Sequence, residues 1–371
     1  MQLDKLSELF VALILRIQEK TPGLVSEIWI NPETLNQIKN TYTSSNNETI
    51  IKKFTESLAS EPDLSRKEYL TGLLTSLVYQ LGDENDKDLV NFYKNTYDFD
   101  LTCISEKEIS EANAKLQKLE RDNNLYRHDL FLKLNVKKEN LLPEFKRYLD
   151  KYKALLPKYL ETNGEFEYEV VSQAPWGAFN YHIAPFISKL TLNSSVGLTT
   201  LDLKHLAVHE AFGGHHTELS LKDRLLVNKQ RGENGFVLVY SPQVFISEGL
   251  AEAAFEIFQY DKDLTIEEQV ISAYQDLSIA LTNKVVFMYY QDKLPKEEIE
   301  KYIDSFDMGD LGKSNIINFV YDQIFGEYPA VYYSAKKFML ETYERAKDKK
   351  GFLLEVYTQP VTPSLLARKY R

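Results

Sequence analysis

The chain has 371 residues, of which 43% are hydrophobic and 27% are charged, a balance that indicates a folded globular protein and excludes a disordered one. The formal net charge is −11, from 44 basic and 55 acidic residues, and no dense tract of lysine and arginine occurs, so we expect neither nucleic acid nor a membrane surface as a partner. Cys103 is the only cysteine, which excludes an intrachain disulfide and a thiolate metal cluster and fits a cytoplasmic location.

Residues 1–162 show helical periodicity interrupted by short polar stretches, which predicts several separate helices. The first segment, MQLDKLSELFVALILRIQEK, has an apolar run too short to cross a membrane and no basic leader, so we expect an amphipathic helix packed on the body. Capping-box spacing predicts helix starts at Ser65–Glu68 and at Ser105–Glu108, and YLTGLLTSLVYQL between them predicts a buried helix. The polar stretches DENDKD, 83–88, and RDNN, 121–124, are expected to be connectors.

The pattern changes at residues 165–195, where β-branched and aromatic residues alternate with polar ones, and this predicts two or three short strands. From residue 199 to the C-terminus the periodicity is helical again. We therefore expect a mainly α fold with a small β-sheet at about residues 165–195. We divide the chain into a helical N-terminal region, 1–162, and a second region, 163–371, packed together as one continuous body.

The segment HEAFGGHH, residues 209–216, holds three of the six histidines beside a glutamate. The helix that leads into it is expected to begin at a cap formed by Thr199 and Asp202, which have capping-box spacing. It is expected to stop at Gly213 and Gly214, because glycine adopts the backbone conformations that end helices.

A metal site in this segment depends on that break. In an unbroken helix His209 would lie about 9 Å along the axis from His215 and about 10.5 Å from His216, too far for easy shared coordination. A bend would bring the second pair of histidines back toward His209 and Glu210, in an arrangement related to the zinc-hydrolase motif H-E-x-x-H.

Two other interpretations of the histidines stay open. His205 and His209 have the one-turn spacing that shared coordination needs, but no glutamate lies between them to act as a base. The histidines could also be partnered or exposed groups near a helix end, where a positive imidazolium suits the helix dipole. Four of the six histidines fall within twelve residues beside a glutamate, and this clustering favours the metal site.

A third ligand is predicted on the next helix, FISEGLAEAAFEIF, residues 245–258. Apolar residues stand at i−4, i+3 and i+7 from Glu248, so its carboxylate is expected to be buried and to need a partner such as a metal ion. Glu252 and Glu256 turn progressively away, and we expect them to support the ligands from behind or to be exposed.

The segments HEAFGGHHTELSLKDRLL and ISEGLAE resemble a group of uncharacterised prokaryotic proteins whose signature is H-E-x-x-P-G-H-H followed by a later E-G. These proteins are similar to the gluzincin metallopeptidases, a zincin group that includes thermostable zinc carboxypeptidases and thimet-type oligopeptidases. The resemblance extends from about residue 65 to the C-terminus and is sharp only over residues 209–252. In this chain Gly213 replaces the proline of the signature, which leaves the second ligand open.

The resemblance implies a zincin-like multi-helix body with one zinc ion and a role for each residue of the motif. These roles are His209 as first ligand, Glu210 as base, His215 as second ligand, Glu248 as third ligand, and His216 as the alternative second ligand or a group behind the ligands.

Three further residues are candidates for the site. Tyr333, in EYPAVYYSAKKF, is the candidate donor for the developing oxyanion because the resembling proteins also have a tyrosine there, and Tyr332 is the alternative. His182 either lines the cleft or has a structural role. By analogy, KLTLNSS, residues 189–195, is expected to be an edge strand that binds extended substrate.

We therefore expect a zinc-dependent hydrolase that acts on peptides or related amides through a metal-activated water, with Glu210 as the base. Neither a G-x-S-x-G elbow nor a phosphate-binding loop occurs in the chain. The alternatives are a metal-binding but catalytically inactive helical binding protein and a metal-free helical scaffold. The sequence does not indicate the oligomeric state.

Overall fold

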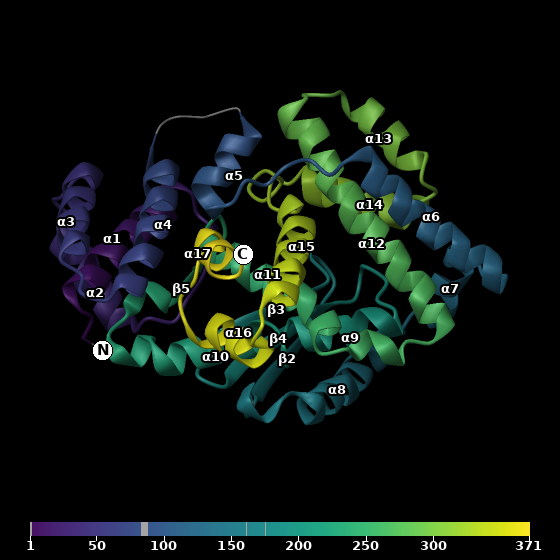
Figure 1. The fold of residues 1–371 in the computed structure, drawn as a ribbon, viewed down its shortest axis with the longest axis horizontal. Coiled ribbons are helices and arrows are strands. Elements are labelled where there is room, and N and C mark those ends of the chain that lie inside the picture. The colour runs from purple at the N-terminus through teal and green to yellow at the C-terminus, as the bar shows by residue number, and fades with distance from the viewer. Residues whose placement is uncertain (1, 83–87, 161, 175) are drawn as a thin grey trace.

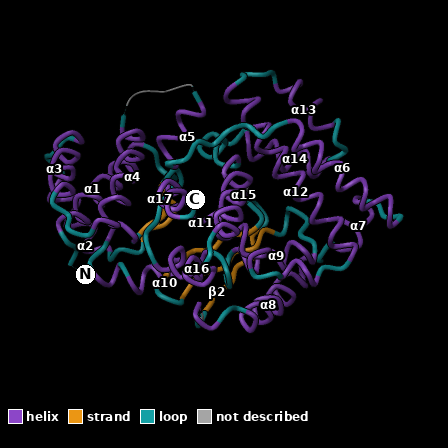
Figure 2. The backbone as a smooth tube through the Cα atoms, viewed as in Figure 1, coloured by secondary structure: helices purple, strands orange, loops and turns teal. Residues whose placement is uncertain are grey.

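The computed structural model describes residues 2–82, 88–160, 162–174 and 176–371, and it is mainly helical, as predicted (Figures 1 and 2). The α-helices in these ranges are α1 (Lys5–Lys20), α2 (Pro32–Tyr42), α3 (Asn47–Ala59), α4 (Leu64–Leu81), α5 (Leu89–Tyr97), α6 (Glu106–Asn123), α7 (Arg127–Leu134), α8 (Lys138–Leu155), α9 (Thr200–His209), α10 (His215–Leu225), α11 (Pro242–Ile257), α12 (Ile266–Val286), α13 (Lys296–Asp304), α14 (Gly309–Val320), α15 (Ala330–Arg345), α16 (Lys349–Thr358) and α17 (Pro363–Lys369). None of these helices combines the length and the apolarity that crossing a membrane requires.

The predicted sheet is present and has three strands, β2 (Glu165–Val171), β3 (Ala178–Ala184) and β4 (Ile187–Asn193). The strand order is β2-β4-β3, with β2 parallel and β3 antiparallel to β4. Residues 189–195 are therefore not an edge strand as predicted, because most of them belong to the central strand β4. The two edges of this sheet belong to β2 and β3.

The helix starts show where capping residues act. Ser105 with Glu108 and Thr199 with Asp202 form the predicted capping boxes. The prediction at Ser65 is wrong, because Asp63 caps α4 two residues earlier and accepts a hydrogen bond from the backbone of Arg66.

The structure describes only one of the two predicted connectors completely. Residues 83–87 of DENDKD lie outside the described residues. RDNN is mostly helical, because α6 continues to Asn123 and ends only where Asn124 adopts the left-handed conformation, with φ 51°.

The first helix is packed on the body, as predicted, with Leu9, Phe10, Leu13 and Ile14 buried. A second contact was not predicted: β1 (Val25–Ile28) pairs antiparallel with β5 (Phe236–Leu238), more than 200 residues later. The two predicted regions thus contact each other through backbone hydrogen bonds, while the boundary at residue 162 stays a prediction.

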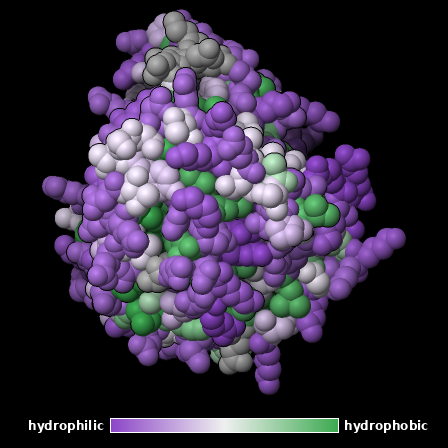
Figure 3. Space-filling view, turned by 90° about the vertical axis from the view of Figure 1, so that its left-hand side faces the viewer, coloured by the Kyte–Doolittle hydropathy of each residue, from purple (hydrophilic) through white to green (hydrophobic). Residues whose placement is uncertain are grey.

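Figure 1 shows how the elements surround the site. Helices α1–α4 lie at one end of the molecule, α6, α7 and α12–α14 lie at the other, and the three-stranded sheet with α8 and α9 lies between them on one side. On the face seen in Figure 3, hydrophobic side chains form small patches separated by polar ones. Helix α11 is buried along nearly its whole length and packs against α15 and α9, so polar side chains on it are held within the protein.

Candidate metal centre

The predicted break at the glycine pair is confirmed. Helix α9 ends at His209, Glu210 is its C-cap, and α10 begins at His215. Gly213 has φ +129°, a conformation that residues with a side chain rarely adopt, and a Cβ atom on Gly214 would lie 1.8 Å from the carbonyl oxygen of His209. Both positions therefore require glycine, and the tight turn reverses the chain as it enters α10.

This turn brings His215 next to His209, and both face Glu248 on α11. The ligand atoms of the three side chains all lie within 4.8 Å of one another. The Nε2 atoms of the two histidines are 3.2 Å apart, and Glu248 Oε2 and Oε1 lie 3.5 Å from His209 Nε2 and 3.6 Å from His215 Nε2. We call this group of three side chains the metal centre.

The other ring nitrogens fix the protonation of the two histidines. His209 Nδ1 lies 3.2 Å from a carboxylate oxygen of Glu252, which only accepts hydrogen bonds. His215 Nδ1 lies 3.1 Å from the hydroxyl of Ser247, whose hydrogen is donated to Glu218. Both Nδ1 atoms therefore carry a hydrogen, and each Nε2 atom presents a lone pair to the same point when its ring is neutral.

Two facing lone pairs at 3.2 Å repel each other, so a positive charge, either a proton on one Nε2 atom or a metal ion, is expected between the two rings. Burial lowers the pKa of His209, but the hydrogen bond to Glu252 and the charges of Glu210, Glu252 and Glu248 outweigh this effect and raise that pKa to about 10. The surroundings thus favour a cation at the point where the three side chains meet.

Glu248 supplies the second observation that points to a cation. Its side chain is buried, and its Oε1 accepts a hydrogen bond from the hydroxyl of Tyr328 at 2.6 Å. Among the described residues its Oε2 has no hydrogen-bond partner, although a buried carboxylate oxygen without one is costly. Two imidazole nitrogens and one carboxylate oxygen are a donor set that suits zinc and leaves a coordination position open, so the residues present fit this ion.

Glu210, the predicted base, is held beside the metal centre by its own backbone. Its carbonyl oxygen accepts hydrogen bonds from the side chain of Asn180 on β3 at 2.6 Å and from the backbone of His216 at 3.2 Å. Burial raises the pKa of its carboxyl group, and the charges of His209 and His215 lower it in part. A carboxyl group with a raised pKa is suited to exchange protons near neutral pH.

His216 lies away from the metal centre. Consecutive residues on a helix point in directions about 100° apart, and here His216 points toward the sheet. Its Nδ1 lies 2.8 Å from the hydroxyl of Ser188, its ring packs on Phe166 at 4.6 Å, and burial lowers its pKa to about 3. The alternative that His216 is the second ligand is therefore wrong, and no described contact joins its side chain to the three donors.

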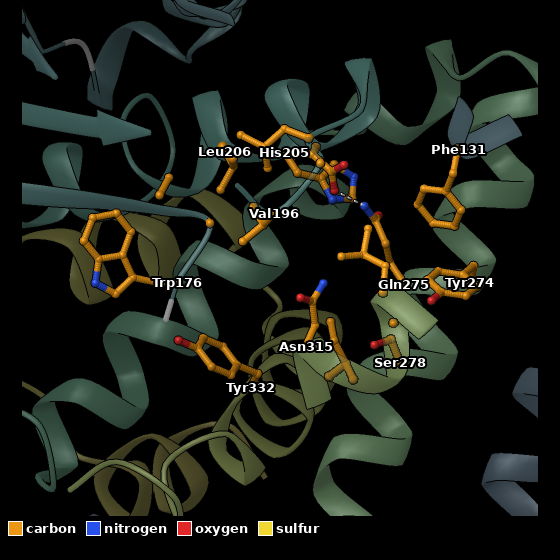
Figure 4. A pocket seen from close by; sticks show the side chains of 18 of the residues that line it. Phe131, Trp176, Val196, His205, Leu206, Tyr274, Gln275, Ser278, Asn315 and Tyr332 are labelled. Atoms are coloured by element: carbon orange, nitrogen blue, oxygen red, sulfur yellow. Dashed lines mark hydrogen bonds between the residues drawn. The ribbon is translucent and has the colours of Figure 1, made fainter. Parts of the chain in front are cut away.

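The tyrosine prediction also needs correction. The hydroxyl of Tyr333 donates a hydrogen bond to Glu108 on α6 at 3.1 Å and takes no part in the metal centre. Tyr332, one position earlier on α15, lines the cavity beside His209 and Glu210 (Figure 4). Burial and the nearby carboxylates raise the pKa of Tyr332, so its hydroxyl remains a donor.

The remaining histidines have other surroundings. The ring of His205 packs on Phe255 at 4.2 Å, and its Nε2 is buried without a hydrogen bond to the described residues. His205 and His209 therefore do not direct their ring nitrogens to a common metal position. His182 is fully buried, and its Nε2 lies 2.9 Å from Asp223, which gives it a structural role.

A cavity of about 680 Å³ opens on His209 and Glu210. Its walls come from the start of β3 and from α7, α9, α12, α14 and α15, and Figure 4 shows side chains from these elements arranged around an open space. A volume of this size accommodates a short peptide segment.

Three supporting residues were not predicted from the sequence, namely Ser247, Glu218 and Tyr328. The sequence contained a signal for Ser247 and Glu218, because each is a polar residue on a mostly buried helix. Ser247 lies one position before Glu248, and Glu218 lies three positions after His215. Tyr328 had no such signal, because it comes from the segment before α15.

Comparison with known proteins supports the fold alone. No family model matches the chain, and no curated protein is significantly similar to it. A predicted lipoprotein from Colwellia psychrerythraea has a similar structure, with 15% identity and a TM-score of 0.56, over 96% of this chain and 65% of that one. A predicted lipoprotein of unknown function from Shewanella oneidensis is similar at 10% identity and a TM-score of 0.52, over 98% of this chain and 73% of that one.

The chain thus spans 65% of the length of the Colwellia protein. An M32 carboxypeptidase from Deinococcus radiodurans shares 12% identity at a TM-score of 0.41, over 99% of this chain and 81% of that one, a similarity too low to support any inference about chemistry.

Proposed function

We propose that the protein is a zinc-dependent hydrolase that cleaves peptides or related amides. One observation carries this proposal: His209 Nε2, His215 Nε2 and Glu248 face one point, with the buried carboxyl group of Glu210 beside it and a cavity in front. Three protein ligands, an open position and an adjacent carboxylate are the parts of a catalytic zinc site.

The residues of the chain have separate roles in this mechanism. Bound zinc supplies a Lewis acid that acidifies water and polarises a carbonyl group. Glu210 accepts the proton of the attacking water and passes it to the leaving nitrogen. Tyr332, whose hydroxyl stays protonated, is the proposed donor to the oxyanion in place of Tyr333.

The edge of the sheet offers a place for the substrate backbone. The carbonyl oxygen of Gly177 accepts a hydrogen bond from Asn193 of β4, so the backbone groups of Ala178 point the other way, toward the edge of β3. Because residues 176–178 line the cavity, an extended peptide can pair with this edge beside Glu210.

The test uses a Glu210→Gln variant. We expect the variant to bind zinc as the wild type does and to lose roughly 10²- to 10⁴-fold in the rate of peptide hydrolysis, because only the proton acceptor is removed. Zinc content is measured by elemental analysis and hydrolysis with a fluorogenic peptide library. Full activity of Glu210→Gln contradicts the mechanism, whereas a zinc-loaded wild type that cleaves no peptide supports the inactive binding protein instead.

A further inference from the structure

The cavity in front of the metal centre carries more negative than positive side chains. Among the described residues that line it, four are carboxylates, Asp202, Glu210, Glu252 and Asp276, and Lys336 is the one lysine or arginine. A carboxylate entering this space therefore depends on Lys336 for a charge partner.

Lys336 already has partners. Its Nζ lies 2.7 Å from Glu256 Oε1 on α11 and 3.9 Å from Asp276 Oδ1 on α12, and its side chain is mostly buried. Burial lowers its pKa, but the charges of Glu256 and Asp276 outweigh this effect and raise it, so the group stays charged. Glu256 already matches the charge of Lys336, and Asp276, which also pairs with Lys115 at 3.0 Å, adds a second negative charge nearby, so a third carboxylate gains little from this ammonium.

The metal ion does not change this balance. A bound dication faces three carboxylates, those of Glu248, Glu210 and, behind the neutral ring of His209, Glu252. The metal centre therefore has no surplus positive charge, and in Glu210→Gln the two remaining carboxylates still match the ion. Asp202 is held by Thr199 and by the amide of Gln275. A free carboxylate in the cavity would thus face repulsion and loss of hydration without a compensating ion pair.

The walls indicate what the cavity accepts instead. Trp176, Val196, Leu206, Phe131 and Tyr274 turn apolar surfaces toward the open space (Figure 4). Burying apolar side chains of a peptide against these surfaces is favourable, by roughly 25 cal/mol per Å². The cavity therefore suits an uncharged, apolar stretch of chain.

We propose, on the basis of the proposed function, that this cavity binds the uncharged apolar part of a peptide and disfavours a free C-terminal carboxylate, so that the protein cleaves internal peptide bonds rather than removing C-terminal residues. An arginine or an unpaired lysine is the group that receives a terminal carboxylate in proteins. The described lining of this cavity has neither.

Binding of a matched pair of peptides tests this directly. The pair is N-acetyl-Leu-Phe-Leu with either a C-terminal carboxamide or a free carboxylate. The protein is zinc-loaded Glu210→Gln, which lacks one of the carboxylates that repel the free acid. A preference for the carboxamide in this variant is therefore a lower bound on the preference of the wild type. Titration is followed through tryptophan fluorescence, since Trp176 lines the cavity. We expect the carboxamide to bind at least about tenfold more tightly. Equal or tighter binding of the free acid, or binding of neither peptide, overturns the proposal.

A second variant tests the role of the paired lysine. Glu256 does not line the cavity, and Glu256→Gln, introduced into the same zinc-loaded protein, removes one of the two charges on Lys336. We expect the preference for the carboxamide to shrink several-fold through tighter binding of the acid. The matched control is Glu355→Gln, which removes a carboxylate from a lysine pair outside the cavity and should leave the preference unchanged. An unchanged preference in Glu256→Gln would contradict the role of Lys336.

Hydrolysis by the zinc-loaded wild type separates this inference from the proposed function. If neither peptide nor longer apolar peptides are cleaved while the carboxamide still binds preferentially, the proposed function is wrong and the binding preference stands. If single C-terminal residues are released from free-acid peptides, the proposed function stands and this inference is wrong.

Discussion

Two buried polar clusters in this protein differ in how completely their groups are partnered. In the first, the arginine cluster, Arg66 contacts Asp4 at 2.7 Å, Glu61 at 3.0 Å and Glu233 at 2.7 Å, and the hydroxyl of Ser7 donates to Glu233. Both oxygens of the fully buried Glu233 accept hydrogen bonds. In this cluster protein groups satisfy one another.

The metal centre shows the opposite arrangement. The Nε2 atoms of His209 and His215 face each other, and Oε2 of Glu248 has no hydrogen-bond partner among the described residues. The arginine cluster joins α1, α4 and the short 3-10 turn Gly232–Asn234 before β5, and it holds them together because removing one partner leaves a buried charge unpaired. The metal centre joins α9, α10 and α11. Its ligand atoms are not fully partnered within the protein, so a bound ligand can still gain favourable interactions with them.

The largest effect is expected from breaking the arginine cluster. Arg66→Met should lower the free energy of unfolding by about 3–5 kcal/mol, because it leaves the carboxylate of Glu233 buried without its partner. Urea denaturation followed by circular dichroism measures this change, and zinc affinity should stay as in the wild type. The control is Arg345→Met, which breaks a half-exposed pair with Glu341 and should cost less than about 1 kcal/mol. A loss in Arg66→Met as small as in the control would show that the cluster does not stabilise the fold.

The same kind of change in the metal centre should have the opposite sign for the metal-free fold. Glu248→Gln keeps the oxygen that accepts from Tyr328 and removes a buried charge without a hydrogen bond at Oε2. We expect zinc affinity to fall by about 100-fold or more, roughly 3 kcal/mol, and the metal-free variant to be at least as stable as the metal-free wild type. Chelator competition gives the affinity and denaturation the stability. A metal-free variant destabilised by several kcal/mol would mean that Glu248 is a structural group like Glu233.

Glu27 on β1 resembles Glu248 in that it is buried and accepts one hydrogen bond, from the backbone N–H of His182 at 2.6 Å. Burial raises its pKa to about 8, the bond from His182 opposes this rise, and the charge of Glu210 adds to it. The unfolded chain releases this proton near pH 4.5, whereas the folded chain holds it to about pH 8, so the folded state binds more protons across this window. Stability from this group is therefore present below pH 4.5 and is lost as the pH rises toward 8.

Glu27→Gln should remove that part of the pH dependence. The wild type is expected to lose roughly 2 kcal/mol of stability more than the variant between about pH 5 and pH 7. Denaturation midpoints measured across this range test the difference, with Glu33→Gln at the exposed start of α2 as the control. Parallel curves for wild type and Glu27→Gln would show that the carboxyl group ionises in the folded protein as it does in water.

What could be predicted from the sequence follows from the range of the interactions involved. Helix periodicity, the caps at Ser105 and Thr199, and the break at the glycine pair depend on neighbours within a few residues, and these predictions are confirmed. The pairing of β1 with β5 joins strands of four and three residues that lie more than 200 residues apart in the chain, and neither strand is long enough to show a period.

The side of a helix on which a residue lies limited the prediction of the site for the same reason. His215 and His216 are adjacent, as are Tyr332 and Tyr333, and each pair differs by about 100° around its helix. The bend that selects His215 and the packing of α15 that selects Tyr332 are set by contacts with the sheet, α6 and α11, which the local sequence does not specify. The partners that fix the ligand rings come from other helices for the same reason.

The smallest effect should come from such a partner, Ser247, which links His215 to Glu218. Ser247→Ala leaves the three ligands in place but removes the acceptor that fixes the ring of His215 with its Nε2 toward the metal. We expect zinc affinity to fall about tenfold, near 1.4 kcal/mol, because a partner of a ligand contributes less than a ligand does. The control is Ser278→Ala, which changes a hydroxyl in the cavity wall away from the ligands and should leave the affinity unchanged. If Ser247→Ala binds zinc as the wild type does, the glycine turn alone sets the orientation of His215, and this ligand needs no hydrogen bond from a neighbouring side chain to bind zinc.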